Sequence, residues 1–308
     1  MVRKAPRTPD RTHRRRDRHS RDLAPPGGGG DPGPGEPKLR KNRPDRPAGR
    51  PKAARAAGAG DWIWGRHAVV AALGNPARLC KRLVATPEAA EALSLETRPG
   101  MEDGQGPALE IIARPEIEAL LPPGAIHQGV ALRALPLPPV SLGEILPPEA
   151  VAPPGSAPIR IVLLDQVTDP QNLGTILRTA AAFGARAVVV PKRHAPELTG
   201  AVIKAASGAV EKLALVRVAN LAAALAELKD HGFWTVGLDA RAEDRIDRFD
   251  FPARTALVLG SEGGGLRRLT RENCDYLAHI PFTGEMESLN VAAAAAIALY
   301  AASTRPAA

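Results

Sequence analysis

The 308-residue chain has few cysteines, few aromatic residues and no long apolar run. Its two cysteines, Cys80 and Cys274, are too few for a disulfide framework or a cysteine-rich metal site, so we expect no metal and a reducing, cytoplasmic location. The most apolar run, residues 291–302, spans about 12 residues, whereas a bilayer helix needs roughly 20. The basic start of the chain lacks the apolar segment of a secretory signal. Together these absences argue against a secreted disulfide-rich protein and against a membrane protein.

Aromatic residues are also absent from the first 60 positions, which instead hold 10 Pro and 9 Gly. This segment carries 17 Lys or Arg against 6 Asp or Glu, a net charge of +11, whereas residues 61–308 carry 24 against 27, or −3. It cannot bury enough apolar surface to offset its chain entropy, so residues 1–60 predict a disordered basic tail. The tail is either a solvated extension or an arm that attracts nucleic-acid phosphates without reading their sequence.

The composition shifts at Asp61, where a first folded segment begins. Ile63, Val69, Val70 and Leu73 give a short helix an apolar face, and Gly74-Asn75-Pro76 ends it. Strand-like and helix-like stretches then alternate at 81–86, 87–96, 108–113, 114–121 and 127–135. This alternation predicts a small α/β domain over residues 61–135. The Pro-rich residues 136–157 predict an exposed, semi-rigid linker.

Residues 158–308 predict a second α/β domain that begins with a buried strand at 158–167. Further strands are expected at 186–191, 214–218, 233–239, 255–260 and 276–282. Helices are expected at 172–184, 197–211, 221–232 and from 288 onward. Such a pattern favours an open parallel sheet with helices on both faces and a ligand site beyond the carboxyl ends of its strands.

Three clusters follow predicted strands of this domain. In the first, residues 165–184, the chain turns at Asp169-Pro170 and enters a helix that holds Asn172, Gly174 and Arg178. Asn172 and Arg178 are six positions apart and share no helix face, so they converge only if Asn172 lies in the entry turn. Gly174 lets the helix backbone approach another element closely. Taken alone, the cluster is also explained by a helix cap and a surface arginine.

The second cluster, residues 256–266, is an apolar strand followed by the glycine-rich loop 261–265. It lacks the Lys-Ser/Thr of a Walker loop and the spacing of a dinucleotide fingerprint, so phosphate binding is weakly indicated. The backbone of the loop could face a neutral heterocycle, or the loop could simply be flexible.

The third cluster, residues 280–291, leaves a strand and enters an Ala-rich helix, for which Ser288 is a candidate N-cap. The Ala-rich face of that helix permits close packing, either inside the core or across a subunit boundary.

In order along the chain, DPxNxGxIxRTAxxFG, LVLGSEGxG and IPxxGxxxSLNVxxAxxIxLY closely resemble the motifs of the SpoU branch of the SPOUT RNA methyltransferases. Upstream, GRHAVVAAL and AIHQGVAL are similar to parts of the ribosomal-protein-like substrate-binding domain of bacterial 23S ribosomal RNA guanosine 2′-O-methyltransferases in this family. The resemblance implies a SPOUT-type parallel sheet with a deep trefoil knot from about residue 255 onward, a rare exception to the rule against knots.

The resemblance also implies the site. The methyl donor S-adenosylmethionine would be held mainly by backbone groups at Gly260, Ile280 and Leu289, with Ser261 and Gly263 nearby. The catalytic and substrate-orienting groups would be Arg178, Asn172, Glu262, Ser288 and Asn290. The chain departs from the commonest motif at Met286 and Glu287. A homodimer through the knotted domain is implied as well, in which Arg178 serves the cofactor of the partner.

The methyl of a sulfonium is already activated, so such an enzyme must position a ribose 2′-hydroxyl in line with it and help to remove a proton. No histidine lies within the motifs, and we expect His194 and His279 at the surface or at sheet ends. An arginine stays protonated in proteins and is therefore a poor base. We therefore hypothesise that Arg178 binds the adjacent phosphate and stabilises developing alkoxide, while the proton leaves late or to solvent.

The sequence thus favours a cytoplasmic, homodimeric enzyme that methylates a ribose 2′-oxygen in ribosomal RNA, most simply a guanosine of 23S ribosomal RNA. Two alternatives stay open: a transfer RNA substrate, and a catalytically inactive RNA-binding or ribosome-assembly factor. The separate domain at residues 61–135 argues against the first. The retained polar residues of the three motifs argue against the second.

Overall fold

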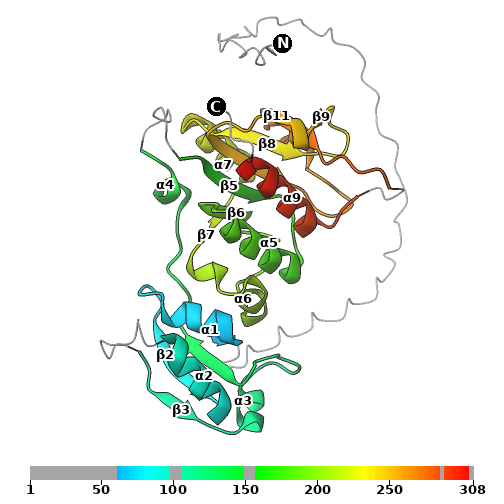
Figure 1. Cartoon of the computed structure of the whole chain (residues 1–308). Coiled ribbons are helices and arrows are strands. Elements are labelled where there is room, and N and C mark those ends of the chain that lie inside the picture. The colour runs from blue at the N-terminus through cyan, green and yellow to red at the C-terminus, as the bar shows by residue number, and fades with distance from the viewer. Residues whose placement is uncertain (1–60, 98–105, 149–156, 285–287, 305–308) are drawn as a thin grey trace, which may run out of the picture. The chain divides into compact units, whose positions relative to one another are not determined.

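Two β-sheets organise the residues that the computed structural model describes, namely 61–97, 106–148, 157–284 and 288–304 (Figure 1). The first sheet belongs to the small domain, residues 61–135, and the second to the large domain, residues 158–304. The expected basic tail, residues 1–60, and the motif departures Met286 and Glu287 lie outside the described residues. The tail therefore stays a prediction.

The small domain is built on a sheet with strand order β1-β4-β2-β3. β4 pairs antiparallel with β1 and β2, whereas β2 and β3 are parallel. Helices α1 and α2 cover one face of this sheet, which includes Ile63 and Leu83, and α3 covers the other, which includes Trp62 and Val84. The elements are β1 (Trp62–Trp64), α1 (Arg66–Leu73), β2 (Cys80–Ala85), α2 (Pro87–Thr97), β3 (Leu109–Ile111), α3 (Arg114–Leu120) and β4 (Val130–Ala134).

The Pro-rich stretch between the domains is not simply an exposed linker. It contains the short helix α4 (Leu142–Ile145), and Val140 forms a bridge with Val216 of the large sheet. Leu142, Ile145 and Leu146 are buried against that sheet. The expectation of an exposed connection is therefore wrong for residues 140–146. Their apolar side chains lower the free energy of the fold when packing on the sheet removes them from water.

The large domain contains a sheet with strand order β7-β6-β5-β10-β8-β11-β9, and each pairing in it is parallel. Its central strands read as continuous apolar runs, as expected for a sheet covered on both faces. The strands are β5 (Ile159–Leu164), β6 (Ala187–Pro191), β7 (Ala214–Val218), β8 (Trp234–Leu238), β9 (Asp244–Arg245), β10 (Arg254–Leu259) and β11 (Tyr276–His279).

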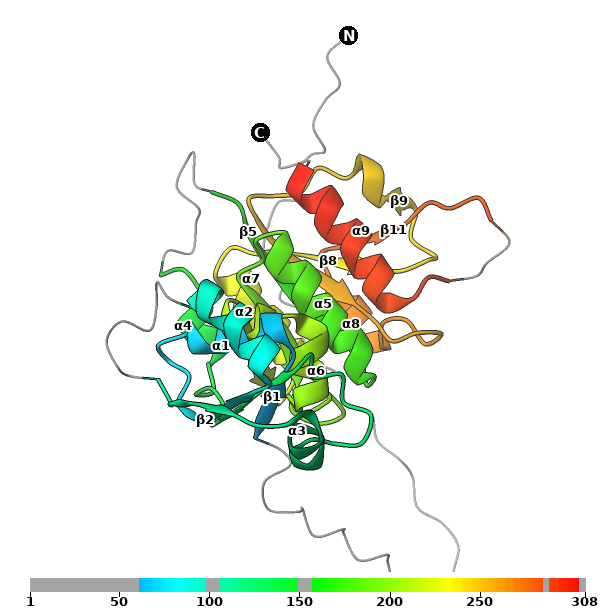
Figure 2. The same cartoon turned by 60° about the horizontal axis from the view of Figure 1, so that its bottom comes forward.

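Helices cover both faces of the large sheet, as the sequence predicts. α5, α6 and α9 lie on one face, where α5 and α9 run side by side (Figure 2), and α4 and α7 lie on the other. α5 begins at Pro170, and α9 is itself apolar and rich in alanine. The helices are α5 (Pro170–Ala182), α6 (Gly200–Ala206), η1 (Ala209–Glu211), α7 (Leu221–Asp230), η2 (Ile246–Arg248), α8 (Arg268–Glu272) and α9 (Val291–Thr304).

Some elements differ from the expectation. The helix expected over 197–211 stops at Ala206, because Ser207 and Gly208 both adopt left-handed backbone angles, and η1 follows as a separate turn. Ile63 lies in β1 and not on the first helix as expected, because Gly65 has a left-handed φ of 88° and α1 begins only at Arg66. Short β1, β9 and α8 carry too little periodicity to be foreseen. Among the described residues, no helix is long and apolar enough to cross a membrane.

The strand order fixes where a ligand would bind. From β5 the chain moves outward to β6 and β7, and it then returns across the sheet to β8, so β5 and β10 meet at the point where the order reverses. Ligands of open α/β sheets bind at such a point, beyond the carboxyl ends of the strands. The first and second motif clusters follow β5 and β10 at this edge. The trefoil knot implied by the resemblance stays a prediction, because strand order alone does not establish it.

Candidate functional site

Asn172, Glu262 and Asn290 form one hydrogen-bonded cluster that joins the three sequence motifs. The side-chain amide of Asn172 donates to Glu262 Oε1 at 3.0 Å, and that of Asn290 donates to the same oxygen at 2.6 Å. Asn290 Nδ2 also lies 3.0 Å from Asn172 Oδ1. Three segments that are far apart in the sequence therefore present one continuous polar surface at the edge of the sheet. We call these three residues the polar cluster.

Helix capping places both asparagines. The carboxylate of Asp169 caps α5 by accepting from the backbone N–H groups of Gln171 and Asn172 at 3.2 and 3.1 Å. Asn290 caps α9, since its Oδ1 accepts from the N–H groups of Ala292 and Ala293 at 2.8 and 3.3 Å. Each asparagine is thereby locked at the start of a helix.

The expectation that Ser288 caps the last helix is wrong. α9 begins at Val291, so Asn290 occupies the capping position and Ser288 lies two residues earlier, with an exposed side chain. The sequence offered both a serine and an asparagine before the apolar run, and both residue types are favoured caps.

The carboxylate of Glu262 lies at the positive ends of two helices. Its Oε1 accepts from the backbone N–H of Val291, at 3.3 Å, in addition to the two asparagine amides. α5 and α9 are 13 and 14 residues long, so each presents its partial positive charge at this edge. These three donors hold the carboxylate of Glu262 in one orientation.

The glycine-rich loop after β10 is tightly folded. Ser261 and Gly265 exchange backbone hydrogen bonds of 3.1 and 2.9 Å across it. A Cβ at position 260 would lie 2.0 Å from the carbonyl carbon of Gly265, so only glycine fits there. Gly263 has a left-handed φ of 72° and open space where a side chain would be. The loop is therefore an ordered turn with accessible backbone groups.

The remaining residues expected to hold the methyl donor lie at the same edge. Ile280 directly follows β11 and is half-buried against the core, and Leu289 precedes the cap of α9 with 36% of its surface exposed. Together with Gly260, Ser261 and Gly263 they provide backbone polar groups and apolar side chains, but no charge.

Arg178 does not join the polar cluster within one chain. It lies on α5 six residues beyond Asn172, which is about 9 Å along the helix and roughly 120° around it. Its side chain is exposed, and no hydrogen bond or ion pair involves its guanidinium in the part of the chain that the structure describes. Asn172 does lie in the entry turn, but this does not bring Arg178 to it.

One ion pair with a buried carboxylate was not foreseen at the site. Asp165, at the end of β5, is fully buried and accepts from Arg267 Nε at 2.6 Å and from the Arg267 backbone N–H at 3.1 Å. It therefore anchors the chain just after the glycine-rich loop to the neighbouring strand. The available signal was an acidic residue at the end of an apolar strand, which alone does not name its partner.

Gly174 behaves as expected. A Cβ at this position would lie 2.5 Å from the Cβ of Ala205, so the absence of a side chain allows α5 and α6 to pack closely. His194 is exposed and His279 ends β11, in line with the expectation for both. Within the described ranges, no group of three or more His, Cys, Asp or Glu could hold a metal ion.

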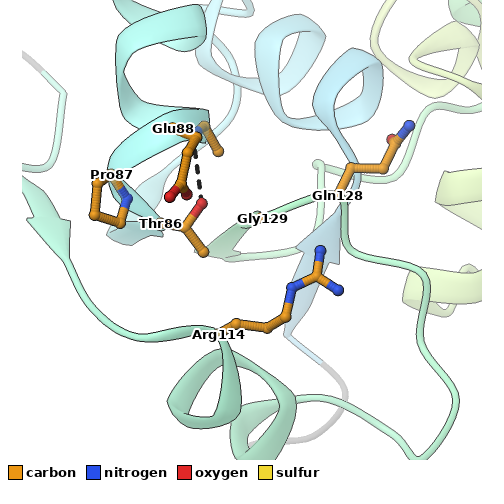
Figure 3. A pocket seen from close by; sticks show the side chains of 7 residues that line it. Thr86, Pro87, Glu88, Arg114, Gln128 and Gly129 are labelled. Carbon is orange, nitrogen blue, oxygen red and sulfur yellow. Dashed lines mark hydrogen bonds between the residues drawn. The ribbon is translucent and has the colours of Figure 1, made fainter.

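A polar pocket of about 460 Å³ opens in the small domain (Figure 3). The exposed side chain of Arg114, at the start of α3, extends toward the side of the pocket where Gln128 lies. The pKa of Glu88 is lowered by its own backbone N–H, by the Thr86 hydroxyl and by the charge of Arg114. The pocket is lined by Thr86, Pro87, Glu88, Ala89, Arg114, Gln128 and Gly129.

Comparison with known proteins gives two family matches along the chain. The SpoU rRNA Methylase family matches residues 159–300, and the family described as RNA 2′-O ribose methyltransferase substrate binding matches residues 62–140. The first match includes all three motif clusters, and the second includes the polar pocket.

Relatives and a solved structure agree with these matches. A protein of Xylella fastidiosa named 23S rRNA (guanosine-2′-O-)-methyltransferase RlmB is 40% identical over 78% of this chain and 95% of its own length. An uncharacterized tRNA/rRNA methyltransferase of Synechocystis is 36% identical, and the chain spans 61% of that longer protein. The crystal structure of the SpoU methyltransferase AviRb from Streptomyces viridochromogenes in complex with AdoMet is similar with a TM-score of 0.63 and 25% identity, over 79% of this chain and 89% of that one.

Proposed function

The chain belongs to the SpoU family of RNA methyltransferases, and from this premise we propose that it methylates the ribose 2′-hydroxyl of a guanosine in 23S ribosomal RNA. The observation that carries the proposal is the polar cluster, which joins all three family motifs in one site at the switch point of the sheet. The name of the Xylella relative supports the choice of RNA. We assign RNA binding to residues 61–135 and methyl transfer to residues 158–308.

The methyl donor is S-adenosylmethionine, and the residues at the sheet edge fit it. Around Gly263 and Gly265 there is open space beside an accessible backbone, and Ile280 and Leu289 add apolar surface suited to a neutral heterocycle. Gly260, Ser261, Gly263, Ile280 and Leu289 would hold it. When bound, it supplies a methyl group that is already activated for transfer.

The polar cluster would then orient the acceptor. The amides of Asn172 and Asn290 are fixed by Glu262 and by the helix caps, so they need no reorganisation when RNA binds. In the transfer, the 2′-oxygen forms a bond to the methyl carbon as the carbon–sulfur bond breaks, and the hydroxyl proton passes to solvent. Ser288, which is exposed two residues before Asn290, would contact the RNA backbone.

Arg178 would bind the phosphate next to the acceptor ribose and stabilise alkoxide character on it. Because the guanidinium lies away from the polar cluster of its own chain, we assign it to the site of a second subunit. The exposed apolar residues of α9 support a homodimer: Ile297 and Tyr300 expose 39% and 59% of their surface, and Tyr300 packs edge-on against Phe183. A second copy of this face would cover them.

The pocket of the small domain would contact RNA away from the reacting ribose. Arg114 supplies a positive charge with no hydrogen bond or ion pair to other described residues, and Gln128 and Gly129 supply backbone groups from a left-handed turn. The reaction would take place in the cytoplasm, where ribosomal RNA is assembled with protein.

Mapping 2′-O-methyl groups in ribosomal RNA from cells with and without the gene tests the proposal. We expect one guanosine of 23S ribosomal RNA to lose its methyl group, and to regain it when the purified enzyme and S-adenosylmethionine are added to the undermethylated RNA. Loss of a methyl group from transfer RNA instead would contradict the ribosomal assignment. Binding of cofactor without transfer to any RNA would favour a catalytically inactive factor.

A further inference from the structure

A buried ion pair joins the small domain to the large domain. Arg78 follows α1, and its guanidinium donates to the Glu211 carboxylate of η1 at 2.6 Å from Nη2 and at 3.2 Å from Nε. The side chains are only 4% and 2% exposed. Asn75 donates to the same carboxylate at 2.8 Å, and Arg78 also donates to the carbonyl of Leu135 at 2.9 Å. The pair is therefore geometrically fixed and shielded from water.

Close backbone approaches extend this contact along α1 and β1. A Cβ at Gly208 would lie 2.6 Å from the Cβ of Ala71, and one at Gly200 would lie 2.0 Å from the ring of Trp64. Contacts this close between the glycine backbones and the opposing side chains leave no room for one domain to slide over the other. The glycines lie on the large domain and their neighbours lie on the small domain.

A third contact fastens the opposite end of α1. Gln128 Oε1 accepts from Lys204 Nζ of α6 at 3.0 Å and from the backbone N–H of Arg66 at 3.2 Å. Burial lowers the pKa of Lys204. Gln128 also lines the polar pocket, so the proposed RNA site is bonded directly to the large domain.

The path from this junction to the polar cluster is short and tightly packed. Lys204 lies on α6, and α6 packs on α5 where Gly174 leaves room for Ala205. Asn172 lies on the same helix, two residues before Gly174. The orientation of the small domain is therefore tied to the position of the polar cluster through packed helices rather than through the connecting chain.

We propose that Arg78 and Glu211 are positioning residues that determine which nucleotide is methylated. By fixing the small domain on the large domain, they set the separation between the RNA held at the polar pocket and the ribose at the polar cluster. A buried ion pair adds little stability over an apolar contact of similar volume, but it tolerates only one geometry, which suits a positioning role. This inference rests on the proposed function.

Two variants of the full-length protein test the proposal. Glu211→Ala removes the carboxylate, and Glu211→Gln removes only its charge and keeps its shape, so the test can still be made if the alanine variant does not fold. The matched control is the double variant Arg245→Ala/Asp247→Ala, which removes an ion pair that lies within the large domain and is 41% and 48% exposed. Double electron–electron resonance measures the spread of interdomain distances. For this measurement both native cysteines are replaced by serine, and spin labels are attached to the variants Lys81→Cys and Lys192→Cys. Transfer of labelled methyl to undermethylated 23S ribosomal RNA and mapping of the product measure rate and position.

For the Glu211 variants we expect a broader distance distribution and a kcat lowered by about tenfold or more, with KM for RNA changed less than about threefold. Methyl groups should also spread to neighbouring nucleotides, while affinity for S-adenosylmethionine stays within about twofold. The control variant should match the wild type. An unchanged distance distribution, or a broad one with wild-type rate and position, overturns the positioning role. If the wild type itself methylates no RNA, the proposed function fails instead, and the distance measurement separates the two failures.

Discussion

Asn290 donates a 2.6 Å hydrogen bond to Glu262, although the two residues are 28 positions apart and lie in different loops. The same carboxylate oxygen also accepts from Asn172, 90 positions away, and from the first backbone N–H of α9. One oxygen atom thus holds together the starts of two helices and the glycine-rich loop. The arrangement makes Glu262 the common support of the polar cluster.

Replacing Glu262 with alanine should therefore abolish methyl transfer with a modest effect on stability. Both asparagine amides would lose their shared acceptor and reorient, and displacement of orienting groups by about 1 Å can cost on the order of 100-fold in rate. Because the cluster is solvent-exposed, water would satisfy the freed amides, so we expect the free energy of unfolding to fall by about 1 kcal/mol. Labelled methyl transfer and urea unfolding measure the two effects.

Glu262→Gln is the control for this prediction, since it retains an acceptor oxygen but removes the charge. It should keep more activity than the alanine variant if geometry matters most. Activity in Glu262→Ala above half that of the wild type would show that the polar cluster has no part in the reaction.

Mixing two inactive variants tests the assignment of Arg178 to a second subunit. Arg178→Ala and Glu262→Ala should each be inactive, yet a heterodimer of the two contains one site with an intact polar cluster and an intact arginine. In a symmetric dimer, equal mixing should therefore restore up to about a quarter of the wild-type activity. No recovery after subunit exchange, with heterodimers confirmed by mass, would place Arg178 at the site of its own chain or outside catalysis.

The pH dependence of the same reaction tests the role of Arg178. A side chain that only binds phosphate transfers no proton, so Arg178→Lys should retain part of the rate with an unaltered profile between about pH 6 and 8.5, where an ordinary lysine is also charged. An apparent pKa near neutrality that disappears only in Arg178→Ala would instead indicate that this arginine acts as the base.

Much of the fold and part of the site could be predicted from local sequence. Alternating apolar strands and amphipathic helices gave the elements of the large domain, because a sheet covered on both faces needs continuous apolar runs such as residues 159–164. Only the resemblance could predict that Asn172, Glu262 and Asn290 belong to one site. Asn172 and Asn290 are 118 positions apart, and only the tertiary fold brings them together.

Other features depend on contacts that no local pattern carries. α4 was missed because prolines flank its few apolar residues, and its burial is decided by the far face of the large sheet. The Arg78–Glu211 pair spans 133 positions, and each residue alone reads as an ordinary surface charge. The prediction of Ser288 as the cap was wrong for a similar reason: serine and asparagine are both favoured caps, so the local pattern does not show that the helix begins after Asn290.

Arg114→Ala should weaken RNA binding without affecting cofactor binding. Loss of one phosphate contact should reduce affinity about three- to tenfold and lower the slope of log affinity against log salt by about 1. Arg133→Ala, which removes another exposed arginine of the small domain, is the matched control. Fluorescence anisotropy with a labelled RNA fragment at several salt concentrations measures both quantities. Equal losses in the two variants would mean that the pocket has no special role.

Cys274 should resist alkylation in the folded protein. Burial raises the pKa of its thiol to about 12, so at pH 8 the reactive thiolate is rarer by roughly a thousandfold than for a free cysteine. Iodoacetamide at pH 8 should leave Cys274 unmodified in the native protein and modify it rapidly in urea, as peptide mass spectrometry would show. Modification at equal rates in both conditions would contradict the raised pKa of this thiol.

Arg160 should contribute strongly to the stability of the large domain, because it fixes the end of α9. Its buried guanidinium donates to the carbonyl of Ala302 at 3.0 Å, near the end of α9, and to the carbonyls of Pro252 and Ala253 at 3.1 and 2.9 Å. Burial lowers the pKa of this guanidinium, and none of the ion pairs among the described residues includes it. Arg160→Met would leave these carbonyls without a donor in a dry interior, so the free energy of unfolding should fall by about 2–4 kcal/mol. Arg186→Met, at an exposed position, should change it by less than about 0.5 kcal/mol. Equal urea midpoints for the two variants would mean that the carbonyls find other donors and that apolar packing alone holds α9 in place.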